Sequence, residues 1–488
     1  MSFVSSAGII FSWFINGPFA NILKPERREI ESLSKYITIP IEYNTVLMLF
    51  VRIGIFGLAV ISIPVLFAFL YWFLGILHQT AQAFIRDIKK YEIIYLVIIS
   101  VIVIVSISTV FNITSVFYEP DIGNIIGWNV IYSSDSPVHI GSNVFLNISA
   151  TENDLRQPLF ALFAMPLSIY PFLISKTLFF VQNAYPITIQ ILQVFLLQIT
   201  VIMLARMMGL RGISAVVFCV IMSLSYPYIL FTFMIEQYIF AVFYLFLFFY
   251  LYINKDTINI KNGREVFFIA STGSLLTNGV IFPYVIFSKG KNAVRELVRL
   301  GIIFMLTVIL CGKANILLNP FPGITKFMSY AGGGVPVINR LLQYFNFIAL
   351  CIIKPDVIFV HKEFISYQLA PVASFNYLGV LFLMLTVIAF IANRKNKLAQ
   401  ICMAWVVYSS VILFVIGWGT VENGLVLYSL YFAWSFLTLL FMGIEKIFEK
   451  LPSLKYCIYI VMILSLIIIN IPAIYDIIHF GVTYYPAY

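Results

Sequence analysis

Charged side chains are scarce in this sequence. Only 10% of its 488 residues are charged and 61% are hydrophobic, with a mean hydropathy of +0.99. Soluble domains carry about 25% charged residues, so lipid must be the main solvent of this chain. Its apolar runs are continuous rather than alternating, and at about 20 residues each they are long enough to cross a bilayer. Backbone groups in lipid must bond within the chain, so these runs predict helices.

Catalytic and cofactor motifs are absent too. The sequence has no Walker loop, dinucleotide fingerprint, HExxH or GxSxG. It has four histidines, which argues against a site of several histidine ligands, and five scattered cysteines without metal or redox spacing. No internal repeat suggests an inverted-repeat transporter. No cleavable signal peptide is expected, because the first apolar stretch lacks a basic flank and is broken at residues 16–18.

Basic residues exceed acidic ones and give a formal net charge of +9. They occur in short clusters between apolar runs, as the positive-inside rule predicts, and this argues against nucleic acid as a partner. With the clusters placed in the cytoplasm, residues 91–113 cross outward and later runs alternate. The prediction is an all-α polytopic protein of the cell (inner or plasma) membrane, with about 11–12 membrane segments in the bilayer.

The N-terminal part, residues 1–90, is expected to be an extension of the main fold. It holds an interfacial segment, 3–23, and an extra membrane run, 47–77. That run is either one tilted helix or a hairpin bent near Pro64. Basic residues flank it on both sides, so its orientation stays open.

The remaining chain divides into three predicted parts. Residues 91–317 form the core, which includes a long first external loop, 114–187, carrying surface helices. Residues 318–375 form a second external loop. Residues 376–488 form the C-terminal transmembrane helices.

Acidic residues collect in the segments assigned to the outer side. The mid-membrane runs are nearly free of them, which argues against a proton or ion relay at the midplane. The pattern favours a site in an outward-facing cavity. The predicted outer acids are Glu119, Asp121, Asp135, Glu152, Asp154, Glu236, Asp356, Glu363, Glu422 and Asp476.

The first external loop holds the leading catalytic candidates. Asp121 lies just beyond the helix expected at 91–113, where a carboxylate can accept a proton or help to hold Mg²⁺ or Mn²⁺. Glu119 is its supporting acid, and a solvated loop acid is the alternative interpretation. Further along, Arg156 suits bidentate phosphate binding, and Asp154 orients it or takes part in catalysis. The alternative for these two is a local ion pair that caps a helix.

Three more residues complete the candidate set. Glu236 is a lone acid in FTFMIEQYIF, which is costly unless it is paired or faces an aqueous cavity, and Glu422 is similar. Arg340 is a second candidate for binding the donor phosphate, with a snorkelling interfacial arginine as the alternative. His139 and Asp135, in the linker of the first loop, receive no role.

The order of these features resembles the GT-C superfamily of polytopic glycosyltransferases, which use sugars carried on polyprenyl phosphates. An outward helix ends in an acidic loop (PDIGN), followed by a segment NDLRQPLF, an outer-end acid in EQYIF and a split pair of short helices in STGSLLTNGVIFP. NDLRQPLF is similar to an R-H-P-L-F segment of uncharacterised bacterial members, with Gln157 in place of His.

The resemblance implies a GT-C-like fold and a catalytic base or metal residue near the end of the first core helix, which corresponds to Asp121 or to Asp154. It implies transfer of a sugar from a lipid-linked donor to a glycan or lipid acceptor at the outer, extracytoplasmic face. The alternatives are a polysaccharide polymerase or flippase of envelope assembly, and a non-enzymatic assembly protein. The nearly charge-free spans disfavour a polysaccharide transporter.

Overall fold

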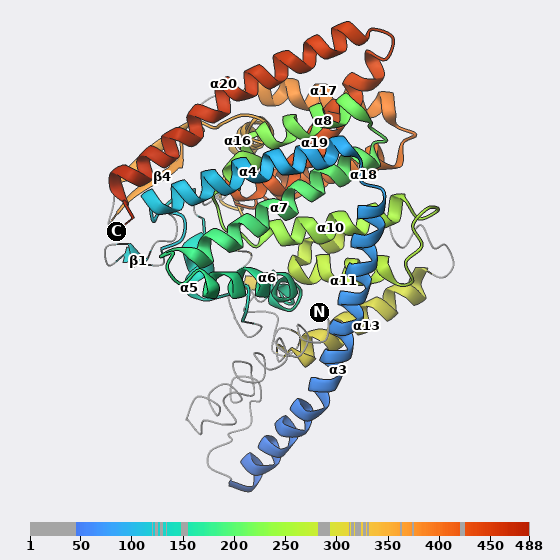
Figure 1. Cartoon of the computed structure of the whole chain (residues 1–488), viewed down its shortest axis with the longest axis vertical. Helices are drawn as coiled ribbons and strands as arrows, with labels where there is room; N and C mark the ends of the chain where they lie inside the picture. Colours follow the sequence, from blue (N-terminus) through green and yellow to red (C-terminus); the bar gives the residue numbers. More distant parts are fainter. Residues whose placement is uncertain are drawn as a thin grey trace. The chain divides into compact units, whose positions relative to one another are not determined.

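The helices and strands are taken from a computed structural model of the chain (Figure 1). It describes residues 45–119, 121–122, 125–126, 130–132, 134–147, 155–281, 293–311, 313, 317, 324–325, 328, 331–361, 364–372, 375–419 and 425–487. These residues are mostly helical, and their strands form two antiparallel ribbons, β1–β2 and β3–β4.

The elements have the following bounds, in chain order: α3 Thr45–Arg86, α4 Lys90–Ile113, β1 Asp121–Ile122, β2 Ile125–Ile126, α5 Ser136–Gly141, α6 Phe160–Thr177, α7 Ala184–Met207, α8 Gly212–Leu224, α9 Tyr226–Leu230, α10 Tyr238–Ile253, α11 Gly263–Ser274, the 3-10 helix η2 Leu276–Ile281, α13 Ala293–Leu310, α16 Val337–Leu350, β3 Val357–His361, β4 Ile365–Leu369, α17 Tyr377–Asn393, α18 Lys397–Ser409, the π-helix η4 Ser410–Val415, α19 Leu425–Ile447 and α20 Pro452–Tyr484.

Among the described residues, seven helical spans are long and apolar enough to cross a membrane: Ile63–Arg86, Lys90–Ile113, Phe160–Thr177, Ala184–Met207, Lys397–Val415, Leu425–Ile447 and Pro452–Tyr484. Helices α8, α10 and α17 are apolar but shorter. The chain is therefore a mostly helical, multi-pass membrane protein, and the count of 11–12 segments stays a prediction. Helix α6 lies where surface helices were expected, yet it is also long enough to span.

The chain folds as two compact units. Unit 1 comprises Met1–Asp87, Ser142–Leu173 and Asp256–Lys326. Unit 2 comprises Ile88–Gly141, Ile174–Lys255 and Phe327–Tyr488.

Unit 1 is built around α3, which continues through Pro64 as a single helix, so the hairpin alternative for 47–77 is not seen. Aromatic rings join α3 to α6, with the centroids of Phe73 and Phe163 5.1 Å apart. The split expected in 266–287 is present, because α11 ends at Ser274 and η2 follows after one residue. A Cβ on Gly273 would lie 2.7 Å from Cβ of Leu159, so glycine permits the close approach of the preceding loop.

Unit 2 is built on antiparallel helices. Helices α4 and α7 lie side by side (Figure 1) and are joined at both ends. At one end Arg206 Nε donates to Glu92 Oε1 at 2.8 Å, and at the other Asn183 Nδ2 donates to the Phe111 carbonyl at 3.0 Å. This arrangement agrees with opposite crossing directions for the two helices. We call the end with Glu92, Arg206, Glu445 and Lys455 the basic end.

Two parts of unit 2 differ from the sequence expectation. Residues 212–231 form one largely apolar run in the sequence, but α8 ends at Leu224 because Ser225 is extended, and α9 restarts with a proline in its first turn. Residues 318–375 were expected to be a loop, but they contain α16 and the β3–β4 hairpin. Helix α16 packs against α17 and α19 through an apolar face that includes Phe347 and Leu350.

Candidate functional site

Segments from five parts of unit 2 meet at the end opposite the basic end. Thr114 Oγ1 donates to the Tyr485 carbonyl at 2.7 Å, the Tyr132 N–H donates to the Tyr367 carbonyl at 2.9 Å, and loop 134–136 contacts Glu236. We call the assembly of residues 114–119, 130–132, 134–141, 231–237, 357–361, 364–369 and 485–487 the acidic end, because several of the predicted outer acids lie in it.

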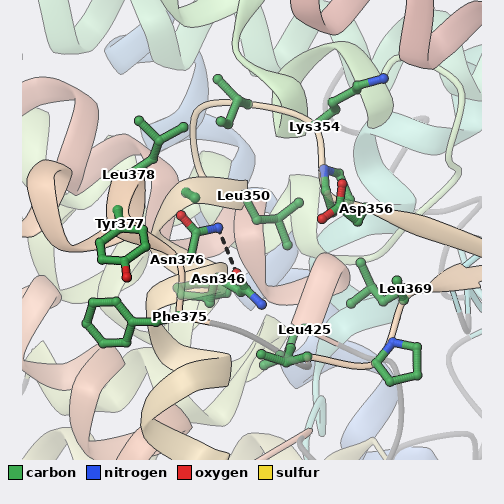
Figure 2. A pocket seen from close by; sticks show the side chains of 17 residues that line it. Asn346, Leu350, Lys354, Asp356, Leu369, Phe375, Asn376, Tyr377, Leu378 and Leu425 are labelled. Atoms are coloured by element: carbon green, nitrogen blue, oxygen red, sulfur yellow. Dashed lines mark hydrogen bonds between the residues drawn. The ribbon is translucent and has the colours of Figure 1, made fainter.

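A cavity of about 480 Å³ lies beside this end, lined by residues from α16, α17 and the ends of the β3–β4 hairpin (Figure 2). Amide, carboxylate and aromatic side chains line it together with leucines. Among the described acids of this end, Glu236 is the most deeply buried.

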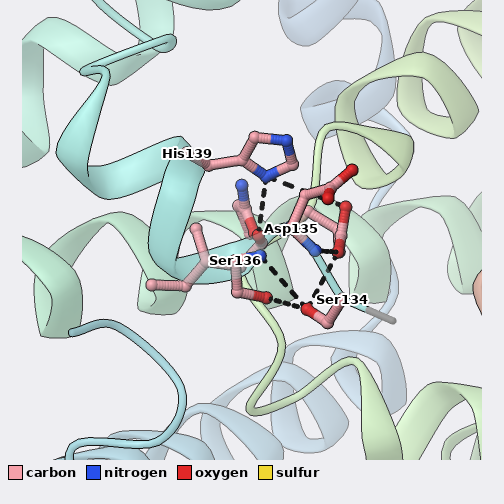
Figure 3. A network of polar contacts seen from close by, with 7 residues as sticks. Ser134, Asp135, Ser136 and His139 are labelled. Carbon is pink, nitrogen blue, oxygen red and sulfur yellow. Dashed lines mark hydrogen bonds and ion pairs between the residues drawn. The ribbon is translucent and has the colours of Figure 1, made fainter. Parts of the chain in front are cut away.

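The carboxylate of Glu236 is contacted by the segment 134–139, whose residues Ser134, Asp135, Ser136 and His139 lie close together in Figure 3. The residue is 1% exposed, and its Oε1 accepts hydrogen bonds from Ser134 Oγ at 3.1 Å and from the Asp135 backbone N–H at 3.2 Å. The Ser134 hydroxyl has one proton, which it donates to Glu236. The Ser136 hydroxyl is therefore the donor in the 2.6 Å hydrogen bond between Ser134 and Ser136. A relay of two hydroxyls therefore leads to the carboxylate.

His139 completes this cluster from helix α5. Its side chain is 2% exposed, and Nδ1 lies 3.7 Å from Glu236 Oε2. Nδ1 also lies 3.1 Å from the Ile235 carbonyl, which can only accept, so Nδ1 carries a hydrogen and donates it. The imidazole is thereby held with its N–H edge toward the carbonyl and the carboxylate.

Two glutamines of α7 support the segment that carries Glu236. Gln193 Oε1 accepts from the Glu236 N–H at 3.3 Å, and Gln190 Nε2 donates to the carbonyls of Phe231 and Thr232 at 2.7 and 2.8 Å. These bonds satisfy backbone groups between α9 and α10 that no helix pairs. The position of Glu236 is therefore fixed from both the α7 side and the loop side.

Tyrosines form the next layer of the acidic end. The hydroxyls of Tyr132 and Tyr226 are 2.7 Å apart, and the rings of Tyr132 and Tyr367 meet edge to face at 5.3 Å. Burial raises the pKa of Tyr132 well above its ordinary value, and burial with the charge of Asp476 raises the pKa of Tyr367 to about 12. Both phenols therefore stay neutral over the physiological pH range.

The cluster can position an acid rather than react directly. A buried carboxylate costs several kcal/mol unless hydrogen bonds compensate it, and here they tie Glu236 to the backbone of Asp135. The side chain of Asp135 itself is only half-buried, at the start of α5. Asp135 is therefore the carboxylate that this arrangement presents at the surface.

The predicted acids of the first loop lie partly in this region. Glu119 is half-buried at the acidic end, and burial, with the charge of Glu119, raises the pKa of its neighbour Tyr118 to about 12. The backbone of Asp121 pairs with Ile126 in the β1–β2 ribbon, but its side chain, and hence the predicted cation site, lies outside the described residues. Asp154 and Glu422 lie outside them as well.

The two predicted phosphate-binding arginines occupy different units. Arg156 belongs to unit 1, where its carbonyl accepts from the Leu276 N–H at 2.7 Å. Arg340 belongs to unit 2 and its Nη1 donates to the Val415 carbonyl at 2.5 Å, at the end of η4. Within the described part of the chain, Nε of Arg340 is buried without a hydrogen-bond partner.

Metal ligands do not cluster within the described ranges, where no group of three or more His, Cys, Asp or Glu side chains is placed to hold an ion. Comparisons with protein families, with curated proteins and with solved structures find no match for this chain. The site is therefore interpreted from its own geometry.

Sequence reasoning identified Glu236 but gave no role to His139, Ser134 or Asp135. Glu236 was recognisable as a single acid between apolar residues. Its partners lie in a segment about a hundred positions earlier, and His139 is separated from Ile235 by 96 positions. No motif spacing connects them, so only the fold shows this association.

Proposed function

We propose that this protein is a membrane glycosyltransferase that moves a sugar from a polyprenyl-phosphate carrier to an envelope glycan, lipid or polymer acceptor at the outer face of the cell membrane. The observation that carries the proposal is the enclosed Glu236 carboxylate, which fixes the loop presenting Asp135. A lipid-linked donor and an acceptor hydroxyl require a fixed base at the membrane surface, and this end of unit 2 supplies one.

In the proposed reaction, Asp135 accepts the proton of the acceptor hydroxyl as its oxygen attacks the anomeric carbon. The bond between that carbon and the phosphate oxygen breaks, and the polyprenyl phosphate leaves with the electron pair. Glu236 is a positioning residue, since it reaches Asp135 only through the backbone N–H. Asp121 and Asp154 remain the alternative bases predicted from the sequence.

The leaving phosphate needs a cationic partner. Arg340 is the candidate in unit 2, because a guanidinium has five N–H donors and, among the described residues, only a donor on Nη1 is engaged, with the Val415 carbonyl. Phosphate binding by Arg340 would use the remaining donors in the bidentate geometry that arginine favours. Arg156 stays a second candidate, in unit 1.

A transfer assay tests the proposal. The full chain is reconstituted in vesicles with a panel of radiolabelled polyprenyl-phosphate sugars, and label is followed into envelope acceptors. Asp135→Asn should lower transfer by about 100-fold or more, the usual contribution of general base catalysis, while melting temperature stays unchanged. Asp256→Asn alters an exposed acid of unit 1 and is the matched control.

The outcomes separate the reaction from its residues. No transfer from any donor would overturn the reaction. Wild-type transfer in Asp135→Asn would overturn the assigned base, and Asp121→Ala and Asp154→Ala in the same assay then test the sequence-derived candidates. Loss in Asp135→Asn alone, with the other two active, would support the geometric assignment.

A further inference from the structure

The cavity beside the acidic end is separate from the residues assigned to transfer. Its volume, about 480 Å³, is within the range of about 300–1,000 Å³ that ligand pockets occupy. Neither Glu236, His139 nor Asp135 lines it. Asp356 and Tyr377 in its lining are exposed, so a ligand can reach it from outside.

An amide pair supplies oriented hydrogen-bonding groups on one side of the cavity. Asn376 Nδ2 donates to Asn346 Oδ1 at 2.7 Å, and Asn376 Oδ1 accepts from the Gly379 N–H at 3.0 Å, which caps α17. These two bonds fix the orientation of both amides. In the part of the chain that the structure describes, Asn346 Nδ2 has no hydrogen-bond partner, so this donor is open to a ligand.

A carboxylate is placed across from the amides. Figure 2 shows Asp356 and the amide pair on opposite sides of Leu350. The Asp356 carbonyl accepts from the Ala370 N–H at 3.0 Å, which holds the residue at the base of the hairpin. Its carboxylate makes no ion pair with the described residues, so its acceptor capacity is also open.

The lining contains one positive and one negative side chain, Lys354 and Asp356. Lys354 is exposed, and in Figure 2 its ammonium group extends away from Asn346 and Asn376. The Lys354 backbone N–H donates to Asn470 Oδ1 of α20 at 3.0 Å. The carboxylate of Asp356 would repel a phosphate or carboxylate brought between it and the amides.

Apolar surfaces complete the cavity. The Tyr377 residue is 79% exposed, and its ring meets Phe375 edge to face at 5.3 Å. Leu350, Leu378 and Leu425 also line the space. A sugar ring presents hydroxyls at its edge and C–H groups on its faces, so it matches a lining in which aromatic and aliphatic surface lies between open amide and carboxylate groups.

We infer that this cavity binds the neutral sugar ring of a glycan or of a glycolipid head group. The hydroxyls accept from Asn346 Nδ2 and donate to the Asp356 carboxylate, while the C–H face packs on Tyr377. Binding follows from the lining alone. Naming the bound sugar as the acceptor of the transfer rests on the proposed function.

Photocrosslinking tests the binding. The full chain in phosphatidylcholine nanodiscs is exposed to dodecyl maltoside that carries a photoreactive diazirine, and crosslinked peptides are mapped by mass spectrometry. Crosslinks are expected in residues 346–378. Asp356→Asn and Tyr377→Ala should each lower them about fivefold or more, the effect of losing roughly 1 kcal/mol of contact. Tyr475→Ala, at a tyrosine of α20 that is 67% exposed, should change nothing.

Competition identifies the source of the sugar. If free maltose competes, the site takes a glycan end; if only unlabelled dodecyl maltoside competes, it takes a glycolipid head, and either result supports the inference. Equal competition by phosphatidylglycerol, or unchanged crosslinking in both cavity variants, overturns it. The crosslinking assay needs no donor and no transfer, so a failed transfer reaction does not affect its result. If crosslinking fails while transfer is intact, only this inference is overturned.

Discussion

At the basic end of unit 2, Glu92 and Arg206 form a buried ion pair, whereas at the acidic end Glu236 is enclosed by a serine hydroxyl, a backbone N–H and a histidine. Both acids are nearly inaccessible, at 5% and 1% exposed. Glu92 has a permanent cation, Arg206, as its partner. Glu236 depends on hydrogen bonds to one short loop.

The difference indicates what each acid does. The ion pair joins helices α4 and α7, and Glu92 also accepts a hydrogen bond from the Lys89 N–H at the start of α4. The hydrogen bonds that Glu236 accepts fix the loop that carries Asp135, and so fix the position of Asp135 at the surface. The basic end is therefore a structural brace, and the acidic end holds the loop that carries Asp135, the base that we propose for transfer. Four experiments test this contrast.

The largest effect is expected from breaking the brace. Arg206→Met leaves the Glu92 carboxylate buried without its cation and should lower stability by about 3–5 kcal/mol, measured by thermal unfolding in detergent. Lys446→Met removes an exposed ion pair with Glu449 and should cost less than about 1 kcal/mol. Equal losses in the two variants would contradict a structural role for the buried pair.

A neutral brace lies between the two ends. Asn470 of α20 donates to the Leu224 and Ile352 carbonyls, at 2.9 Å each, and accepts from Lys354 N–H. Asn470→Leu should lower stability by about 3 kcal/mol, since three bonds of about 1 kcal/mol each are lost. The control is the opposite exchange, Leu464→Asn, which places an amide on the exposed face of the same helix, where lipid is expected. A change under about 0.5 kcal/mol in Asn470→Leu would show that these bonds are dispensable.

The Glu236 cluster should respond differently from the ion pair. Glu236→Gln keeps the shape but replaces charge-assisted bonds with weaker neutral ones, so stability should fall by only about 1–2 kcal/mol. Transfer should fall much further than stability predicts, because Asp135 loses its fixed backbone. Glu449→Gln, at an exposed acid, is the control. Full transfer in Glu236→Gln would mean that the loop is positioned by other contacts.

The smallest effect is a pH dependence confined to the acidic end. The pKa of Tyr367 is raised to about 12, so above pH 10 the unfolded chain loses this proton while the folded chain keeps it, and stability falls as pH rises toward 12. Between pH 9 and pH 11, Tyr367→Phe should lose about 1.4 kcal/mol less stability than the wild type. Tyr475→Phe should follow the wild-type profile, and a matching profile for Tyr367→Phe would contradict the burial of this phenol.

Helix positions could be predicted where composition alone sets them. The predicted run 91–113 corresponds to α4, Lys90–Ile113, and the predicted C-terminal helices of 376–488 begin with α17, Tyr377–Asn393, because each apolar run is bounded by polar residues. Helix α16 was missed because Arg340, Gln343 and Asn346 divide its apolar residues in the sequence, so no continuous apolar run marks it. Its buried side exists only because α17 and α19 cover it.

The candidate site was predicted only in part, for a different reason. Glu236 was found because an isolated acid in an apolar segment needs compensation. The compensating groups have no distinguishing sequence pattern. They are Ser134, the Asp135 N–H and His139, which the fold brings next to the segment between α9 and α10. Sequence shows that a buried charge requires partners, and tertiary structure decides which ones it receives.

The bond between Thr114 and Tyr485 has a consequence for biogenesis. It joins residues 371 positions apart, so α4 enters the membrane long before its partner segment is synthesised. Proteins fold progressively as they emerge, and contacts of such separation form last. The Glu92–Arg206 ion pair can form once α7 follows α4, whereas the acidic end must wait for α20. Nascent chains halted before α20 should therefore hold the helices of unit 2 without a closed acidic end, which limited proteolysis of stalled intermediates can detect.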